Sequence, residues 1–225
     1  MLKIAIGLTF IFTALCAQNL RTLQEAGVDV IVDEKPVRIV REIPRECVGL
    51  GPNISTVWGG EYANTSLSPA CKKSFATTVG KIQPMSIHPK IQTVGELEVL
   101  DFIKNKLALE PENYVLIDSR GADWFETGSI PGAVNLPYYE ILFDPDFEED
   151  YERMLRLTRV SKQGDVYSFE NAKTLLLFCN GSWCGQSTIT IGNLMEIGYP
   201  PEKLLWFRGG MQDWRLHNFT TTSPL

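Results

Sequence analysis

The sequence is poor in several features that would point to common functions. Its 225 residues include only two histidines, His88 and His217, and the cysteine spacings do not match a zinc cluster. The 21 Lys and Arg are outnumbered by 27 Asp and Glu, so the formal charge of -6 gives no positive field for nucleic acid. We therefore expect no metal, no other cofactor and no nucleic-acid partner.

Long hydrophobic runs are also scarce, and the one at the N-terminus is short. The segment Ile4–Leu15 is almost wholly apolar, follows Lys3 and ends in mostly small residues. A membrane-spanning helix needs about 20 apolar residues. The pattern predicts a signal peptide over residues 1–17, cleaved after Ala17, and a periplasmic or secreted protein with no membrane span after cleavage. A buried helix, an uncleaved anchor and lipidation of Cys16 are the alternatives.

Removal of residues 1–17 would leave four cysteines, at positions 47, 71, 179 and 184. An even number in an oxidising compartment indicates disulfides, and four cysteines permit three pairings. Proximity in the sequence favours a Cys179–Cys184 pair, with Cys47 and Cys71 as the other.

Residues 18–92 read as an N-terminal extension. The runs Val28–Val32 and Val37–Val40 have β-type composition and are separated by a turn-rich tetrad, which predicts a hairpin. From Gly49 to Ala70 the chain is rich in Gly, Ser, Asn and Pro, and we expect irregular structure there.

Residues 93–225 show the alternation of an α/β domain with a central, largely parallel sheet flanked by helices. The predicted strands are Tyr114–Ile117, Leu175–Phe178 and Lys203–Phe207. The predicted helices are Gly95–Leu107, Pro137–Phe143, Glu148–Leu157, a segment with Ile189, Leu194, Met195 and Ile197 on one face, and Met211–Leu216. Sites in such sheets lie at the carboxyl ends of the strands.

Cys179 stands at one of those ends, directly after Leu175–Phe178. The loop that follows consists of Asn180, Gly181, Ser182, Trp183, Cys184, Gly185, Gln186 and Ser187, and it contains no Lys or Arg. Inward-pointing amides of this loop would stabilise an anionic sulfur. A helix N-terminus with Ser187 as N-cap would also lower the pKa of the thiol.

Three segments of the domain form a recognisable set, namely the strand with Asp118-Ser119-Arg120 and its following Gly128–Pro137 turn, the Cys179 loop, and Arg208-Gly209-Gly210 with Trp214. Together, in this order, they resemble the rhodanese family of sulfurtransferases. The resemblance covers roughly residues 93 to 220.

The resemblance implies an enzyme in which Cys179 carries sulfane sulfur as a persulfide. The donor would be a small persulfide, polysulfide or thiosulfate, and the acceptor a thiol. Asp118 and Arg120 match the family's Asp-x-Arg element, and we expect them to form a supporting ion pair.

The loop departs from the family where a cation that helps to hold anionic donors usually stands, because that position is Cys184. Thiosulfate is therefore a doubtful donor, and phosphatase relatives, which need a phosphate-gripping Arg, are excluded. Cys184 could instead attack a persulfide or mixed disulfide on Cys179, in exchange with a periplasmic redox partner. It could also be a buried apolar filler.

Two rival interpretations come from other classes. Residues 183–187 resemble a thioredoxin-type site whose second Cys is Ser, but too little chain follows for that fold. The domain could also be a non-catalytic binding module on a rhodanese scaffold.

Overall fold

The computed structural model describes residues 28–32, 35–39, 44–49, 68, 80–217 and 219–222. Two units make up the chain, Met1–Pro89 and Lys90–Leu225. The predicted signal peptide, Cys71 and most of the segment 49–70 lie outside the described residues.

A two-stranded antiparallel hairpin belongs to the first unit. Strand β1 (Val28–Val32) pairs with β2 (Lys35–Ile39), which confirms the predicted hairpin. The second strand begins earlier than predicted, because Pro36 is already paired opposite Ile31. A single 3-10 turn, η1 (Arg45–Cys47), carries the buried and disulfide-bonded Cys47.

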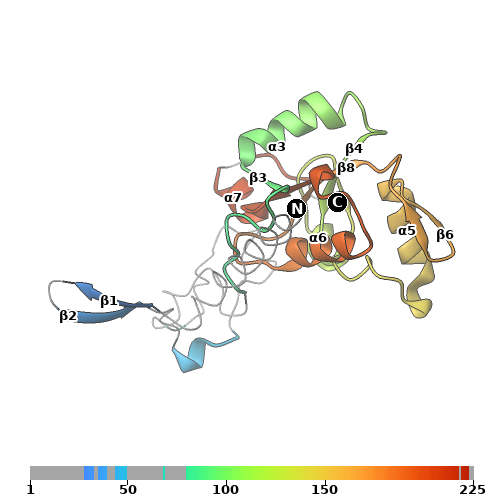
Figure 1. The fold of residues 1–225 in the computed structure, drawn as a ribbon. Coiled ribbons are helices and arrows are strands. Elements are labelled where there is room, and N and C mark those ends of the chain that lie inside the picture. Colours follow the sequence, from blue (N-terminus) through green and yellow to red (C-terminus); the bar gives the residue numbers. More distant parts are fainter. Residues whose placement is uncertain are drawn as a thin grey trace, which may run out of the picture. The chain divides into compact units, whose positions relative to one another are not determined.

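Five parallel strands form the centre of the second unit (Figure 1). In spatial order they are β3 (Gln92–Val94), β9 (Leu204–Phe207), β8 (Thr174–Phe178), β4 (Tyr114–Asp118) and β5 (Ala133–Asn135). All four ladders between them are parallel. Their carboxyl ends therefore meet at one edge of the sheet, and the predicted α/β class is confirmed.

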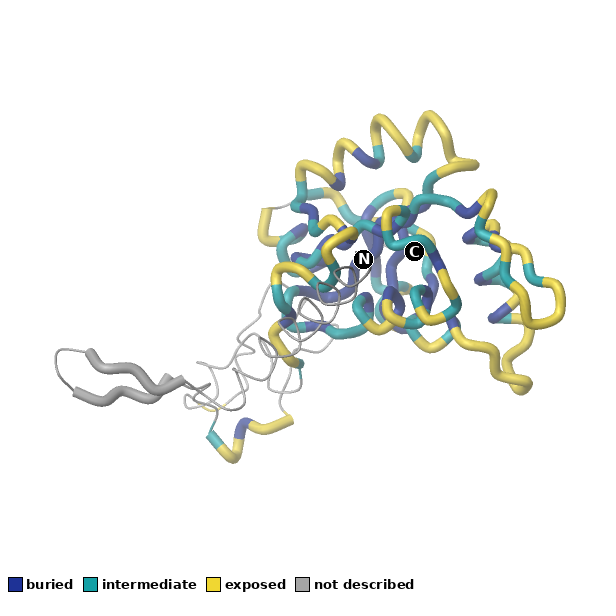
Figure 2. Tube along the Cα trace, viewed as in Figure 1, coloured by how far each residue is buried: buried dark blue, intermediate teal, exposed yellow. Residues whose placement is uncertain are grey.

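Two of the three inner strands, β4 and β8, are apolar without alternation because helices cover both of their faces. Leu175, Leu176 and Leu177 of β8 are at most 1% exposed, and Leu116 and Ile117 of β4 are fully buried. Figure 2 shows the buried backbone concentrated in this sheet, whereas most of the outlying helical surface is exposed.

Helices and short turns connect the strands. They are α3 (Glu96–Phe102), the π-helical η3 (Ile103–Leu107), α4 (Ala122–Glu126), η4 (Pro145–Phe147), α5 (Glu148–Thr158), α6 (Gln186–Glu196), η5 (Pro201–Lys203) and α7 (Gly210–Leu216). An antiparallel hairpin of β6 (Ser161–Gln163) and β7 (Val166–Ser168) follows α5. Helices α3 and α6 lie on opposite sides of the central sheet (Figure 1).

The helix predicted over Pro137–Phe143 is wrong, because the segment consists of turns and bends. The Glu140 N–H closes a turn onto the Pro137 carbonyl, at 2.9 Å. The Tyr138 N–H donates to the Ser119 carbonyl at the sheet edge, at 3.2 Å, which holds this segment against the end of β4. A tertiary contact has overridden the local pattern.

Two predicted helices are present, but the residues that they bury differ in part from those that their apolar spacing indicated. In α3 the buried side chains are Val99 and Phe102, while Leu97 is 72% exposed. In α6, Leu194 is fully buried as predicted, but Ile189 is 46% exposed and Ile191 is buried instead.

Candidate active site

The carboxyl edge of the sheet brings together segments that are far apart in the sequence. Phe178 pairs in register with Asp118 on one side and with Phe207 on the other. Cys179, which follows Phe178, therefore lies beside Ser119, whose backbone N–H donates to the Phe178 carbonyl at 2.9 Å. The glycines that begin α7 follow Phe207 on the other side.

The Cys179 thiol is buried at this edge, with 2% of the residue exposed. Its Sγ lies 3.2 Å from the Ser187 hydroxyl and 3.4 Å from the Cys184 carbonyl, to which the thiol donates. Both contacts come from the loop and the first turn of α6. The loop and the start of α6 therefore enclose the sulfur.

Burial alone raises the pKa of Cys179, because it disfavours the thiolate. Hydrogen bonds from the Cys184 thiol, the Ser187 hydroxyl and the backbone N–H groups of Ser187 and Gly181 oppose this effect. Together they outweigh it and lower the pKa of Cys179 from 9.0 to about 7. The nucleophilic form is thus populated near neutral pH.

Cys184 has the opposite character. It is 5% exposed, and burial, its hydrogen bond to Cys179 and the negative charge of that neighbour raise its pKa well above 9.0. Its Sγ also lies 3.5 Å from Gln186 Oε1, a second acceptor for its single proton. One thiol of the pair is therefore an activated nucleophile and the other a protonated donor.

Cys179 and Cys184 are both free thiols, so the disulfide favoured by their proximity in the sequence is not formed in this structure. The hydrogen bond between them takes its place. Cys47 is disulfide-bonded, and because both loop thiols are free, neither of them is its partner.

The first residues of the loop are anchored to α7. The backbone N–H of Met211 donates to the Cys179 carbonyl at 3.0 Å, and that of Gln212 to the Asn180 carbonyl at 2.9 Å. Gly210 permits this approach, because its φ is +58° and a Cβ would lie 2.2 Å from the Cys179 carbonyl oxygen. Sequence reasoning did not predict this contact between α7 and the thiol loop.

Side chains reinforce the same contact. The Trp183 indole donates to Gln212 Oε1 at 2.6 Å, and Gly181 leaves room for that bond, because a Cβ there would lie 2.8 Å from the same oxygen. Of the remaining predicted loop residues, Asn180 is buried and Ser182 is partly exposed. Sequence reasoning missed Gln212, which no local motif connects with the loop.

Ser187 does not have the predicted N-cap role. Gly185 is the N-cap of α6, without a side-chain capping bond, and Ser187 is already inside the helix. Its fully buried hydroxyl instead contacts Cys179 and accepts a hydrogen bond from Trp206 Nε1 at 3.0 Å. The serine therefore contributes to the site through its side chain.

The expected ion pair between Asp118 and Arg120 is present and fully buried. Arg120 Nη2 lies 2.6 Å from Asp118 Oδ2 and donates to the Gly128 carbonyl at 2.7 Å. Ser129 also donates to Asp118 Oδ2, at 2.6 Å. These bonds connect the end of β4 with the turn before β5, which is a structural role.

Three buried polar atoms at this edge have no hydrogen-bond partner within the described part of the chain. They are Ser119 Oγ, Arg120 Nη1 and Asn180 Oδ1. Buried polar groups without partners are uncommon in folded proteins and often mark places where a ligand atom binds. Ser119, at the end of the adjacent strand β4, lies beside Cys179, and Asn180 follows Cys179 in the chain.

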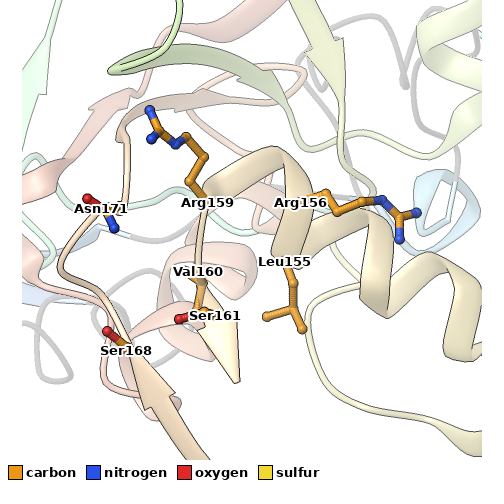
Figure 3. Close-up of a pocket in the computed structure, with 7 residues that line it drawn as sticks. All are labelled: Leu155, Arg156, Arg159, Val160, Ser161, Ser168 and Asn171. Carbon is orange, nitrogen blue, oxygen red and sulfur yellow. The ribbon is translucent and has the colours of Figure 1, made fainter. Parts of the chain in front are cut away.

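A separate hollow of about 350 Å³ lies between α5 and the β6–β7 hairpin. Arg156 and Arg159 line it together with Ser161, Ser168 and Asn171. Figure 3 shows the two guanidinium groups pointing away from each other, so they do not form a clamp for one anion. Neither thiol lines this hollow.

The described residues contain no group of three or more His, Cys, Asp or Glu residues placed to hold a metal ion. None of their helices combines the length and apolar character that a membrane crossing requires.

The family model of the rhodanese-like domain matches residues 103–217. The chain belongs to this family. The match contains the Asp118–Arg120 pair, the Cys179 loop and α7, and so the whole of the site described above. No curated protein matches the rhodanese-like chain significantly.

Solved structures with likeness to the chain have low sequence identity. BH2092 from Bacillus halodurans is 20% identical over 60% of this chain and 78% of its own, with a TM-score of 0.42. A thiosulfate sulfurtransferase from Pseudomonas aeruginosa is 19% identical over 60% of this chain, with a TM-score of 0.39. The match spans only 21% of that protein's length. A rhodanese from E. coli is 20% identical over 49% of this chain and 98% of its own, with a TM-score of 0.32.

Proposed function

We propose that this rhodanese-like protein is a sulfurtransferase in which Cys179 carries sulfane sulfur as a persulfide. The observation that carries the proposal is the environment of Cys179, a buried thiol whose pKa is lowered to about 7 by surrounding hydrogen bonds. A thiolate at neutral pH is what attack on sulfane sulfur requires.

In the first half-reaction, the Cys179 thiolate attacks the outer sulfur of a donor persulfide. A new S–S bond forms, the donor's own S–S bond breaks, and the donor thiolate leaves with the electron pair. In the second half-reaction, an acceptor thiolate attacks the outer sulfur of the Cys179 persulfide. The acceptor becomes the persulfide and the Cys179 thiolate is restored, so no external oxidant or reductant is needed.

The absence of a cation in the loop bears on the donor. Residues 180–187 contain no Lys or Arg, so the stabilisation of a bound anion comes from backbone N–H groups and hydroxyls. A charged hydrogen bond to an anion contributes about 1.5–3 kcal/mol, or one to two decades in affinity. We propose low-molecular-weight persulfide or polysulfide, rather than thiosulfate, as the donor, and a thiol as the acceptor.

A donor panel tests the proposal. Protein is incubated with polysulfide, glutathione persulfide or thiosulfate, and persulfide formation is measured by intact mass. We expect a mass gain of one sulfur atom with the first two donors, loss of this gain in Cys179→Ser, and its retention in Cys184→Ser. No gain with any donor would leave the non-catalytic binding module as the remaining interpretation.

Thiol–disulfide exchange is a second candidate, favoured by the hydrogen bond between the two loop thiols. Cys179 would attack a partner disulfide and form a mixed disulfide. Cys184, after losing its proton, would then attack the Cys179 sulfur, closing a Cys179–Cys184 disulfide and releasing the partner's thiolate. Mass analysis under non-scrambling conditions tests this, because such exchange requires the loop disulfide and Cys184→Ser would stop at the mixed disulfide.

Export of the protein through residues 1–17 stays a prediction from the sequence. N-terminal sequencing of protein recovered from a bacterial host tests it. We expect the mature chain to begin at Gln18, in the periplasmic fraction. An intact Met1 in the cytoplasm would contradict export.

A further inference from the structure

Trp206, in strand β9, presents one hydrogen-bond donor to the thiol site. The residue is 1% exposed, and its Nε1 lies 3.0 Å from the Ser187 hydroxyl oxygen. An indole N–H can donate but cannot accept. Ser187 Oγ is therefore the acceptor in this bond, and the direction of the contact is fixed.

The Ser187 hydroxyl can also donate one hydrogen bond of its own. Within the described part of the chain, its other polar contact is Cys179 Sγ, at 3.2 Å. Once the cysteine is a thiolate, the sulfur can only accept, so the serine must be the donor. A hydroxyl that accepts one hydrogen bond becomes a stronger donor in another, particularly in a buried site.

We propose that Trp206 is a positioning residue for Cys179, acting through a relay in which the indole N–H donates to Ser187 and Ser187 donates to the Cys179 thiolate. The three residues come from β9, α6 and the end of β8. All are at most 2% exposed, so water does not substitute for either bond. The inference rests on the proposed role of Cys179 and adds a residue that does not touch the reacting sulfur.

The charged groups around this relay are few. Cys184 is the titratable neighbour in contact with Cys179. Beyond β8, the end of β4 carries Asp118 and Arg120, which neutralise each other. On the other side, burial and the nearby Glu96 raise the pKa of Asp213 of α7, and Arg208 and His217 oppose that shift only in part. Burial and hydrogen bonds set the pKa of Cys179, so removal of one hydrogen bond has a measurable effect.

A double-mutant cycle tests the relay with the pH dependence of Cys179 alkylation, followed by peptide mapping. We expect the midpoint to rise by about one unit in Ser187→Ala and by about half a unit in Trp206→Phe. Trp206→Phe should have no further effect in the Ser187→Ala background, because the relay is already broken. An additive shift in the double variant, or an unchanged midpoint in Trp206→Phe, would overturn the proposal.

Trp214→Phe is the matched control. Trp214 is 2% exposed, and its indole donates to the Thr220 carbonyl at 2.8 Å, so the variant removes the indole hydrogen bond of a similarly buried tryptophan without involving Ser187. Its alkylation midpoint should equal that of the wild type. A shift as large as that of Trp206→Phe would assign the effect to general loosening of the domain.

A measurement on unmutated protein covers the case in which Trp206→Phe does not fold. In protein labelled with ¹⁵N at the indole nitrogens, the Trp206 Nε1–H resonance should titrate with the same midpoint as Cys179 alkylation, and that of Trp214 should not. The titration should vanish in Cys179→Ser. A Trp206 resonance that is insensitive to pH would contradict the relay. Neither readout uses a sulfur donor, so failure of the relay is distinguishable from failure of the proposed sulfur transfer.

Discussion

The ends of β4 and β8 lie side by side at one edge of the sheet, yet they handle charge in opposite ways. After β4, Asp118 and Arg120 are fully buried and neutralise each other at 2.6 Å. After β8, Cys179 is equally enclosed and has no cation in its loop. There the negative sulfur is stabilised by the thiol, hydroxyl and backbone N–H groups of residues 181–187.

The difference indicates which strand end is structural and which is reactive. In the buried ion pair each charge is balanced by its partner, so the pair fixes the turn before β5 and presents no free nucleophile. A thiolate that is stabilised by hydrogen bonds alone can form a bond to a sulfur atom. The negative charge then leaves its Sγ, and no buried cation loses its partner. The β4 end therefore supports the position of the β8 end, and the chemistry belongs to Cys179.

The largest expected effect is on stability and follows removal of the Asp118 carboxylate. Asp118→Ala leaves Arg120 buried without its partner, and we expect the free energy of unfolding to fall by about 3–5 kcal/mol in urea titrations. Glu152→Ala is the control, because it breaks an ion pair with Arg156 whose side chains are 58% and 67% exposed. That change should cost less than about 1 kcal/mol. Equal effects would remove the distinction between the β4 pair and a surface contact.

A smaller loss of stability is expected from Gly210→Ala. The new Cβ would meet the Cys179 carbonyl oxygen at 2.2 Å, in a residue with φ of +58°. We expect a cost of about 1–3 kcal/mol and a large loss of persulfide formation, because the loop must move.

Gly192→Ala is the matched control for that glycine. Gly192 lies within α6, and a Cβ there meets no atom within 4 Å. This substitution should be neutral or stabilising by up to about 1 kcal/mol. Thermal unfolding and intact-mass analysis of both variants check the pair, and a tolerated Gly210→Ala would show that α7 does not position the thiol loop.

The smallest of these effects concerns the pKa of Cys179 in Cys184→Ala. The Cys184 thiol is a hydrogen-bond donor to Cys179, so its loss should raise that pKa by about one unit, and the alkylation rate at pH 7 should fall several-fold. Cys184→Ser keeps a hydrogen-bond donor, so its Cys179 pKa should lie between those of the wild type and of Cys184→Ala. An unchanged profile in Cys184→Ala would make Cys184 an apolar filler.

The sequence was sufficient for the elements that carry continuous or periodic apolar patterns. The strand before Cys179, the helix over residues 148–157 and the α/β class all depend on local composition, and the structure confirms them. The ion pair of Asp118 and Arg120 was also accessible, because two residues on one strand end cannot separate far.

What could not be predicted depends on neighbours distant in the sequence. The segment Pro137–Phe143 is not helical because its backbone bonds to Ser119 at the sheet edge. Ser187 looked like an N-cap, but the adjacency of β8 and β9 places Trp206 beside its hydroxyl. Strand order is a property of the whole fold, and no local signal in the loop encodes it.

The central claim is that hydrogen bonds, without a cation, hold Cys179 as the reactive thiolate while Cys184 stays protonated. Site-resolved alkylation of wild-type protein across pH, read by peptide mass mapping, tests it most directly. The alkylation rate of a thiol falls as the pH drops through its pKa, because the thiolate is protonated. The rate for Cys179 should therefore show a midpoint at about pH 7. Cys184 should stay unreactive throughout that range. A midpoint of Cys179 at or above 9.0, the ordinary value, or earlier reaction of Cys184, would contradict the account.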